Sequence, residues 1–461
     1  MKSLVYGPTF EEMLHPDRVR PDVRERALRA AKDDPLDPVN LFNITWRNPE
    51  GRVYHVVLPR EFTGIDANVV VLYSRDFPTG SHKVGATYSV AIEHQLAGEI
   101  RPGAHTLVWP STGNYGIGGA WVGPRMGYDS LVILPELMSR ERFEKIESYG
   151  ARYVKTPGCE SNVKEIFDKA KELRADPKVR VLNQFEEFGN YRFHYHVTGN
   201  SCIEVARELA ARGVGNGRIA AFASAMGSAG TIAAGERIKH EFHDARVIAV
   251  EPVQCPTLYW NGYGGHDIQG IGDKHVTWIH NVLETDAVMC VDDIECKKGL
   301  QLATEEAGWK TMAGRYGVPE DGIRAMSEIL GISGICNVLA CIKTAKFYGL
   351  GAGDNLFTIA TDTIDRYHSV MRQLDEAYGR MDETEAAARL SSIFHGAKTD
   401  WVLEGTRHAR QCWFNLKYYT WVEQQGKTVR ELDAQRDPEF WLREQAKAAD
   451  TDAKLREARG W

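Results

Sequence analysis

The sequence predicts an α/β fold with mostly parallel strands, and three observations support this. From Ala67 onward, short apolar runs alternate with longer amphipathic segments, which is the pattern of strands joined by helices. Several of the apolar runs end in turns rich in glycine and small polar residues. The 461 residues have 43% hydrophobic and 26% charged content, which is typical of a globular protein with a large core.

The expected elements follow one another in a regular order after Ala67. Short apolar, β-branched runs bounded by turns define the strands, and longer runs with helical periodicity define the helices. The expected strands are Val69–Tyr73, Thr106–Trp109, Ser130–Leu134, Arg152–Lys155, Val179–Asn183, Arg218–Ser224, Ala245–Val250 and Asn355–Ala360. The expected helices include Tyr88–Gln95, Arg140–Tyr149, Val163–Arg174, Cys202–Arg212, Thr231–His240 and Ile335–Tyr348.

The two ends of the chain differ from this central part. Residues 1–60 are charged and interrupted by prolines, with one expected helix at Arg18–Lys32 and one expected strand at Val53–Leu58. We expect these residues to form an extension that packs on the main body. After Asp382 the expected strands stop, and residues 382–461 indicate a helical appendage. Its aromatic residues are more typical of packing or subunit contact than of a substrate site.

The composition excludes several classes of function. A formal net charge of -7 offers no basic surface for nucleic acid. No stretch is long and apolar enough to cross a bilayer, and residues 1–8 lack the apolar core of a signal peptide. We therefore expect a cytoplasmic protein with no membrane partner. The eight cysteines form no Cys-x-x-Cys pair and no metal-ligand pattern, so we expect free thiols and no metal.

Lys83 lies in the segment Pro78–Thr87, where an expected strand passes into an expected helix. Backbone N–H groups and the positive end of a helix dipole favour a neutral amine there, and also any anion beside it. A neutral amine can form a Schiff base with an aldehyde such as that of pyridoxal 5'-phosphate (PLP). A lysine at a helix start is more often a solvated side chain, so the interpretation depends on the other motifs.

A second turn with small residues follows the expected strand that ends at Trp109. It contains Ser111, Thr112, Gly113 and Asn114. Its open N–H groups suit the binding of a carboxylate, and the asparagine adds a further donor. The alternative is an ordinary tight turn, in which glycine and asparagine are common.

A third turn, at 224–231, ends another expected strand and opens the next helix. Gly227 and Gly230 allow the backbone to approach a ligand closely, and Ser228 and Thr231 can donate hydrogen bonds to phosphate oxygens. The G-x-G-x-x-G spacing of a dinucleotide site is absent. The turn therefore favours a simple phosphate group.

A fourth stretch begins where the expected strand Asn355–Ala360 runs into Thr361, Asp362 and further polar residues. In open α/β sheets, ligands bind beyond the carboxyl ends of the strands. All four stretches can therefore converge on one crevice, and this recurrence is the main argument for a functional site.

The order of these motifs resembles that of the fold-type II PLP enzymes, the tryptophan synthase β-subunit superfamily, and most of all its cysteine synthase and cystathionine β-synthase branch. The likeness covers most of residues 67–372. Further short matches in the same order are Met138–Arg142, Tyr149–Ala151, His196–Gly199, Val250–Pro252, Ile268–Gly272 and Gly331–Gly334.

The resemblance implies a role for each turn. Lys83 would form the Schiff base with PLP and then remove the α-proton of the substrate. Ser111, Thr112 and the Gly113 backbone would bind the substrate carboxylate, and Asn114 would contact the ring oxygen of the cofactor. The phosphate would be held by Gly227, Ser228, Ala229, Gly230 and Thr231.

Three positions depart from the cysteine synthase pattern. His82 is more like the tryptophan synthase β-subunit, where this histidine touches the phosphate, although a packing role has equal weight. Ala229 stands where the family has glycine. Asp362 falls at the expected partner of the pyridine nitrogen, where a carboxylate would make the ring a stronger electron sink. If the count is off by one, Thr361 or Thr363 is the neutral partner.

The resemblance also implies an organisation into two domains, each a mostly parallel sheet flanked by helices. We expect 61–107 and 200–381 to form the large PLP-binding domain, and 108–199 to form the small, mobile substrate domain. The extension 1–60 and the helical appendage 382–461 complete the chain. A homodimer is the expected assembly.

The function implied is β-elimination or β-replacement on a β-substituted L-amino acid, of the cysteine or serine type, through an aminoacrylate intermediate. A racemase or a serine/threonine-type dehydratase is the alternative within PLP chemistry. A non-catalytic binding or scaffold subunit is the alternative from another class. Lys83 and the turn at 227–231 oppose that last alternative, because packing requires neither of them.

Overall fold

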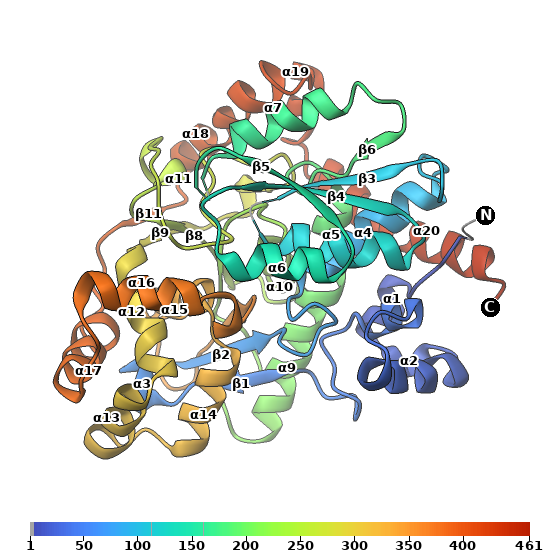
Figure 1. Ribbon diagram of the computed structural model, residues 1–461. Helices are drawn as coiled ribbons and strands as arrows, with labels where there is room; N and C mark the ends of the chain where they lie inside the picture. The colour runs from blue at the N-terminus through green and yellow to red at the C-terminus, as the bar shows by residue number, and fades with distance from the viewer. Residues whose placement is uncertain (1–3, 112, 160) are drawn as a thin grey trace.

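Two mostly parallel sheets organise the chain, as the sequence predicts (Figure 1). The computed structural model describes residues 4–111, 113–159 and 161–461. Within these residues, the larger sheet has seven strands in the order β1-β2-β10-β7-β8-β9-β11. The five inner strands are parallel, and β1 and β11 pair antiparallel at the edges. Its strands are β1 (His55–Val57), β2 (Asn68–Tyr73), β7 (Ala221–Ala225), β8 (Arg246–Pro252), β9 (Ala287–Val291), β10 (Asn355–Ala360) and β11 (Val402–Glu404).

The smaller sheet is all parallel, in the order β5-β4-β3-β6. It consists of β3 (Thr106–Pro110), β4 (Asp129–Pro135), β5 (Arg152–Thr156) and β6 (Val179–Val181). The register aligns Leu107 with Ser130 and Arg180. The whole sheet therefore lies within 106–181, the part of the chain that the sequence predicts to contribute most of the small domain.

Helices cover both sheets and form most of the remaining structure. α15 packs on β7 and β10, α10 on β7 and β8, and α4 lies against α5. The helices of the central part are α3 (Arg60–Thr63), α4 (Lys83–Leu96), α5 (Asn114–Arg125), α6 (Arg140–Ser148), α7 (Val163–Leu173), α8 (Phe188–Phe193), η3 (His194–Gly199), α9 (Asn200–Ala211), α10 (Ile232–Glu241), α11 (Thr257–Trp260), α12 (Asp293–Thr304), α13 (Glu306–Tyr316), α14 (Glu320–Ile329), α15 (Ile332–Tyr348) and α16 (His368–Tyr378).

The expected strands of the central part are all present, but three expectations need correction. The helix expected at Tyr88 begins at Lys83. The structure adds β9, which is not among the expected strands. Strands also do not stop after Asp382, because β11 pairs with β9. That pairing joins segments over a hundred residues apart and has no local sequence signal.

The N-terminal extension and the C-terminal helix are joined to each other, and both ends lie on the same side of the molecule (Figure 1). The carboxyl group of Asp452 accepts hydrogen bonds from the backbone N–H groups of Phe10, at 2.7 Å, and Glu11, at 3.1 Å. Arg459 forms a buried ion pair with Glu12 at 2.8 Å. The helices of these end regions are α1 (Phe10–Leu14), α2 (Pro21–Asp33), α17 (Glu383–Arg389), α18 (Arg407–Lys417), α19 (Val429–Ala434) and α20 (Pro438–Arg459).

No helix of the described residues combines the length and apolar character that a bilayer crossing requires. The same residues hold no cluster of three or more side chains able to ligate a metal ion. All eight cysteines are free thiols, and six of them are buried.

Candidate active site

The turns that the sequence singles out meet at one place in the structure. The Lys83 amine lies 3.2 Å from the Ser228 hydroxyl of the glycine-rich turn. His82 Nε2 lies 3.2 Å from the Thr361 hydroxyl beyond β10. From the small-sheet side, Asn114 Nδ2 donates a hydrogen bond of 2.7 Å to Asp362. The four stretches therefore form a single site beyond the carboxyl ends of β2, β3, β7 and β10.

Lys83 is the first residue of α4 and is only 8% exposed. Burial lowers the pKa of its amine to about 8, and the nearby Asp273 carboxyl group opposes this shift. Burial disfavours the charged form of an amine because a protein interior solvates an ammonium ion poorly. At neutral pH about a tenth of Lys83 is therefore in the neutral, nucleophilic form, far more than for an exposed lysine.

His82 is completely buried beside the lysine. Its ring stacks on Trp46 with ring centroids 5.7 Å apart and meets His194 edge-on at 4.9 Å. Burial, and then the Lys83 charge, hold the pKa of His82 well below its usual range. Nδ1 of His82 has no hydrogen-bond partner among the described residues, so a neutral imidazole can turn one nitrogen toward a ligand.

The glycine-rich turn is tightly packed around Ser228. The Ser228 hydroxyl accepts a hydrogen bond of 2.9 Å from Asn190 Nδ2 in addition to its contact with Lys83. A Cβ on Gly230 would lie 2.1 Å from Asn190 Oδ1, and one on Gly227 would lie 2.8 Å from the Gly270 carbonyl oxygen. A side chain at Gly227 would therefore press on backbone, and one at Gly230 would displace the Asn190 side chain that contacts Ser228.

The start of α10 adds two features to this turn. Ala229 has φ of 59°, in the left-handed region that favours glycine. The Thr231 hydroxyl contacts that of Ser224 at 2.7 Å. Since α10 begins at Ile232, its first N–H groups point toward the turn, as in other anion-binding helix starts.

The turn after β3 is organised by Ser111. Its Oγ accepts hydrogen bonds from the N–H groups of Gly113 at 2.8 Å and Gly116 at 2.7 Å. Gly113 has φ of 148°, and a Cβ there would lie 2.4 Å from Arg142 Nη1. Thr112, the remaining residue expected to bind the substrate carboxylate, lies outside the described residues.

Asp362 is at the centre of a buried hydrogen-bond network. Besides the Asn114 amide, the Tyr367 hydroxyl donates to its carboxyl oxygens at 3.0 and 2.9 Å. Arg142 lies 3.5 Å away and donates to the Tyr367 hydroxyl at 2.9 Å. A Cβ on Gly331, just before α15, would lie 2.2 Å from Asp362 Oδ1. The network ties α5 and α6 to the end of β10.

The residues present fit PLP. A buried amine with a lowered pKa matches the aldehyde, and the hydroxyl groups of Ser228 and Thr231 with the start of α10 match the phosphate. Among the described residues, Asn114 Oδ1 and Asn190 Oδ1 are buried at the site without a hydrogen-bond partner. Such groups are rare in native proteins unless a ligand or water satisfies them.

Comparison with known proteins identifies the family. A family model described as pyridoxal-phosphate dependent enzyme matches residues 58–310, more than half of the chain. A cysteine synthase of Staphylococcus aureus is 33% identical over 304 residues, which cover 66% of this chain and 88% of that protein. The chain therefore belongs to the PLP-dependent enzymes, in the cysteine synthase branch, and its cofactor is PLP.

Solved structures show the same fold. An O-acetylserine sulfhydrylase isoform of Entamoeba histolytica is 26% identical, with a TM-score of 0.59, covering 76% of this chain and 99% of that one. A hydrogen sulfide-producing enzyme of Fusobacterium nucleatum has a TM-score of 0.58 at 23% identity, covering 76% and 95%. The expected family, cofactor and fold class are thus confirmed.

Sequence reasoning missed three side chains of the site: Asn190, Arg142 in its contact with the Tyr367–Asp362 network, and Asp273. Asn190 comes from α8, a segment with no motif, so only the fold brings it to Ser228. Asp273 does have a local signal, because it is an acidic residue directly after the glycine-rich match 268–272.

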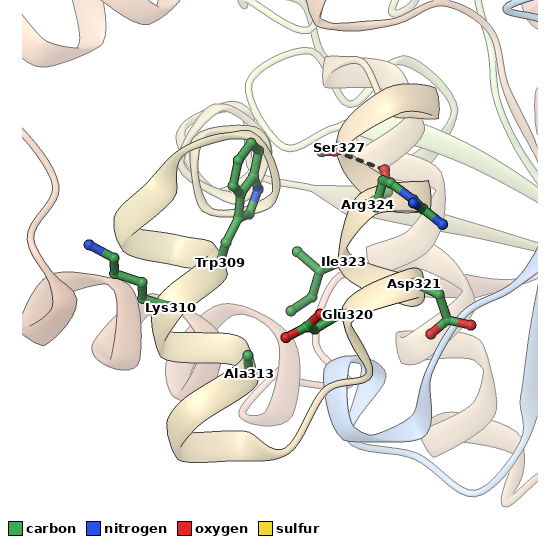
Figure 2. Close-up of a pocket in the computed structure, with 8 residues that line it drawn as sticks. All are labelled: Trp309, Lys310, Ala313, Glu320, Asp321, Ile323, Arg324 and Ser327. Carbon is green, nitrogen blue, oxygen red and sulfur yellow. Dashed lines mark hydrogen bonds between the residues drawn. The ribbon is translucent and has the colours of Figure 1, made fainter.

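A larger groove lies away from this chemistry. It has a volume of about 780 Å³ and lies between α13 and α14, where Trp309 and Ile323 face each other (Figure 2). None of the site residues named above lines it. Although this groove is large, it is not the active site, because the buried Lys83 and its neighbours lie elsewhere.

Proposed function

We propose that the chain catalyses β-replacement or β-elimination on a β-substituted L-amino acid of the serine or cysteine type. One observation carries the proposal: Lys83 is a buried amine with a pKa lowered to about 8, in contact with the glycine-rich turn. Such an amine can attack an aldehyde and can also accept a proton near neutral pH. The cysteine synthase relative from Staphylococcus aureus supports chemistry at the β-carbon.

We assign the contacts of the cofactor to this chain's residues as follows. The turn Gly227–Thr231 and the start of α10 hold the phosphate, with His82 beside it, and Asn114 holds the ring oxygen. Asp362 is the partner of the ring nitrogen, with Thr361 or Thr363 as the neutral alternative. When bound, PLP withdraws electrons from the α-carbon of the substrate and so makes its proton acidic.

The chain itself supplies orientation and proton transfer. The Ser111 hydroxyl, Thr112 and the Gly113 backbone hold the substrate carboxylate. The Lys83 amine takes the α-proton, and the bond to the β-substituent then breaks. Addition of a thiol or another nucleophile gives a new amino acid, whereas hydrolysis gives pyruvate and ammonia. Both outcomes use the same residues.

We further propose that residues 108–199 close on the substrate, while 61–107 and 200–381 hold the cofactor. The contact of Asn114 with Asp362 supports this, since it joins the two parts at the site. We propose a homodimer, on the resemblance to cysteine synthases, and a cytoplasmic location, which the eight free thiols support. Light scattering of the purified protein tests the dimer.

The reaction is tested with purified holoenzyme and a panel of β-substituted L-alanines, each with and without sulfide. We expect pyruvate, a new amino acid or both from at least one donor, and neither from Lys83→Ala. Racemisation alone would favour the racemase alternative, and pyruvate from L-serine alone would favour the dehydratase. A wild-type protein that shows no PLP absorbance after incubation with PLP would contradict the proposal.

A further inference from the structure

Asp273 is a buried acid whose carboxyl group has no hydrogen-bond partner among the described residues. It follows the turn that packs on the glycine-rich loop, where the Gly272 N–H donates to the Met226 carbonyl at 2.6 Å. Its backbone carbonyl accepts a hydrogen bond of 2.8 Å from the Thr257 hydroxyl. The side chain is 6% exposed, and neither carboxyl oxygen has a hydrogen-bond partner among the described residues. Burying an unpartnered carboxyl group lowers the stability of the fold unless a ligand or a water binds it, so such a group often has a role in binding or catalysis.

Two more polar groups in the same state line the cavity that Asp273 faces. They are His275 Nε2 and the Thr277 hydroxyl, both buried and without a hydrogen-bond partner in the part of the chain that the structure describes. The cavity has a volume of about 20 Å³, which is enough for one water molecule. Three polar groups around such a volume form a suitable site for a bound water.

This cavity adjoins the proposed phosphate turn, because Gly227 and Ala229 form part of its wall. Burial raises the pKa of Asp273 to about 8, and the Lys83 amine opposes the shift. Burial, with a smaller contribution from Asp273, also raises the pKa of the Cys255 thiol. Glu251 also faces the cavity, but its oxygens accept hydrogen bonds from the N–H groups of Leu258 at 2.8 Å and Tyr259 at 3.2 Å.

The two histidines of the cavity do not supply a charge at neutral pH. Burial lowers the pKa of His275 to about 3. Burial also lowers the pKa of His280 to about 3, and the ring of His280 contacts the Thr285 hydroxyl at 2.9 Å. The Lys83 amine and the Asp273 carboxyl group are both buried, and each moves the pKa of the other toward its ordinary value.

We propose that Asp273 is a second acid–base residue of the site, which protonates the departing β-substituent, and that His275 and Thr277 hold a water against it. The proposal rests on the proposed function and deepens it by naming the class of donor substrate. Because a protonated acid helps most when the leaving atom is strongly basic, the donors are amino acids whose β-substituent is a hydroxyl or thiol, such as L-serine or L-cysteine.

Lys83 and Asp273 together account for every proton that moves in this step. Lys83 takes the α-proton, and the electrons of the broken C–H bond form the second bond between the α- and β-carbons, which becomes a double bond. The β-substituent leaves with the electron pair of its bond and takes the proton of the Asp273 carboxyl group. Lys83 then passes its extra proton to the Asp273 carboxylate, through the water where needed. Both side chains return to their starting states, and the α-proton has in effect moved to the leaving group.

The test compares donors with different leaving groups in the holoenzyme. For Asp273→Asn we expect kcat to fall about 100-fold or more with L-serine or L-cysteine, the usual size of an acid–base contribution. With O-acetyl-L-serine, whose acetate leaves without a proton, we expect a loss of less than about fivefold. Thr277→Val keeps the shape but removes the hydroxyl, and we expect a smaller loss that is again confined to the basic donors.

Glu251→Gln is the matched control, because Glu251 is a buried acid of the same cavity whose oxygens already have backbone partners. We expect its kcat on each donor to stay within about threefold of wild type. An equal loss on basic and activated donors in Asp273→Asn would overturn the proposal. So would a wild-type enzyme that turns over O-acetyl-L-serine but neither L-serine nor L-cysteine.

A measurement independent of turnover examines the acid itself. The infrared difference spectrum of wild type minus Asp273→Asn should contain a protonated carboxyl band at pH 6 that disappears toward pH 10. Absence of that band at pH 6 would overturn the proposal even if the enzyme were inactive. Wild-type turnover of O-acetyl-L-serine reports the proposed function separately, and retained PLP absorbance shows that each variant is folded.

Discussion

Asp362 and Asp273 are two buried acids of one site with opposite surroundings. Asp362, only 1% exposed, receives hydrogen bonds from Asn114 and Tyr367 and lies 3.5 Å from Arg142. Asp273 receives none from the described residues, and burial raises its pKa to about 8. A carboxyl group with several donors is held in place by the structure, whereas one without donors is kept near the point of gaining or losing a proton.

This difference in hydrogen bonding gives the two carboxyl groups different roles in the site. The Asp362 side joins α5 and α6 of the small-sheet region to the end of β10, so its main effect is on architecture and ring contact. The Asp273 carboxyl group lies against a cavity the size of one water and acts electrostatically on Lys83, so its main effect is on proton transfer.

The largest expected effect is on the Asp362 side. Asp362→Ala removes the acceptor of the Asn114 amide and the Tyr367 hydroxyl and the carboxyl group beside the buried Arg142. We expect the free energy of unfolding to fall by about 3–5 kcal/mol, as for other broken buried pairs. Asp273→Asn should not lower it at pH 6, because the asparagine does not bear the cost of binding a proton that the unfolded carboxyl group has already released. Denaturant unfolding measures both, and equal losses would remove the distinction.

The glycine-rich turn at 227–231 should tolerate few substitutions. In Gly230→Ala the new Cβ would lie 2.1 Å from Asn190 Oδ1, so the Asn190 side chain or the turn has to move away from Ser228. We expect at least a tenfold weaker affinity for PLP, or about 1.4 kcal/mol, measured by titration of the apoprotein. Gly314→Ala, where a Cβ meets nothing within 4 Å, is the control and should leave the affinity unchanged.

The pH dependence of the free energy of unfolding should report directly on the Asp273 carboxyl group. The pKa of Asp273 is raised in the folded protein from its usual 3.8 to about 8. Between these values the folded state binds more protons than the unfolded state, so this group makes stability fall as pH rises. Wild type should lose up to about 1.4 kcal/mol per pH unit relative to Asp273→Asn in this window.

A difference in unfolding free energy between wild type and Asp273→Asn that stays constant from pH 4 to pH 8 would contradict this expectation. Other buried acids with raised pKa values, such as Glu236 and Glu251, are present in both proteins and cancel in the comparison. Unfolding curves at several pH values, at one ionic strength, give the slope.

The smallest effect is expected at Ala229. Its φ of 59° suits glycine, so Ala229→Gly relieves strain in the folded state but increases the freedom of the unfolded chain. We expect a net gain in unfolding free energy of less than about 1 kcal/mol, measured by thermal unfolding. A loss greater than 1 kcal/mol would mean that the alanine methyl group contributes to packing around the phosphate turn.

The sequence predicts more of the fold than of the site. The alternation after Ala67 locates the parallel strands other than β9, because each of them is a local apolar run with turns at its ends. It does not locate β11, whose pairing with β9 depends on segments that are distant in the chain. The turns with Lys83, Ser111, Gly227 and Thr361 could likewise be found, since each lies beyond an expected strand.

The partners of those turns could not be found in the same way. Asn190 reaches Ser228 from a helix whose sequence has no motif. The contacts of Asp362 with Asn114 and Arg142 join residues more than two hundred positions apart. Which acid is fully hydrogen-bonded and which is not depends on the packed structure, and residue types alone do not reveal it.

The central claim is that Lys83 carries the cofactor, and reduction with borohydride followed by peptide mass spectrometry tests it most directly. The account predicts that holoenzyme reduced with borohydride carries one phosphopyridoxyl group, on the peptide that contains Lys83, and that Lys83→Ala carries none there. Attachment at another lysine, or an unmodified Lys83 in a protein that retains PLP absorbance, would contradict it.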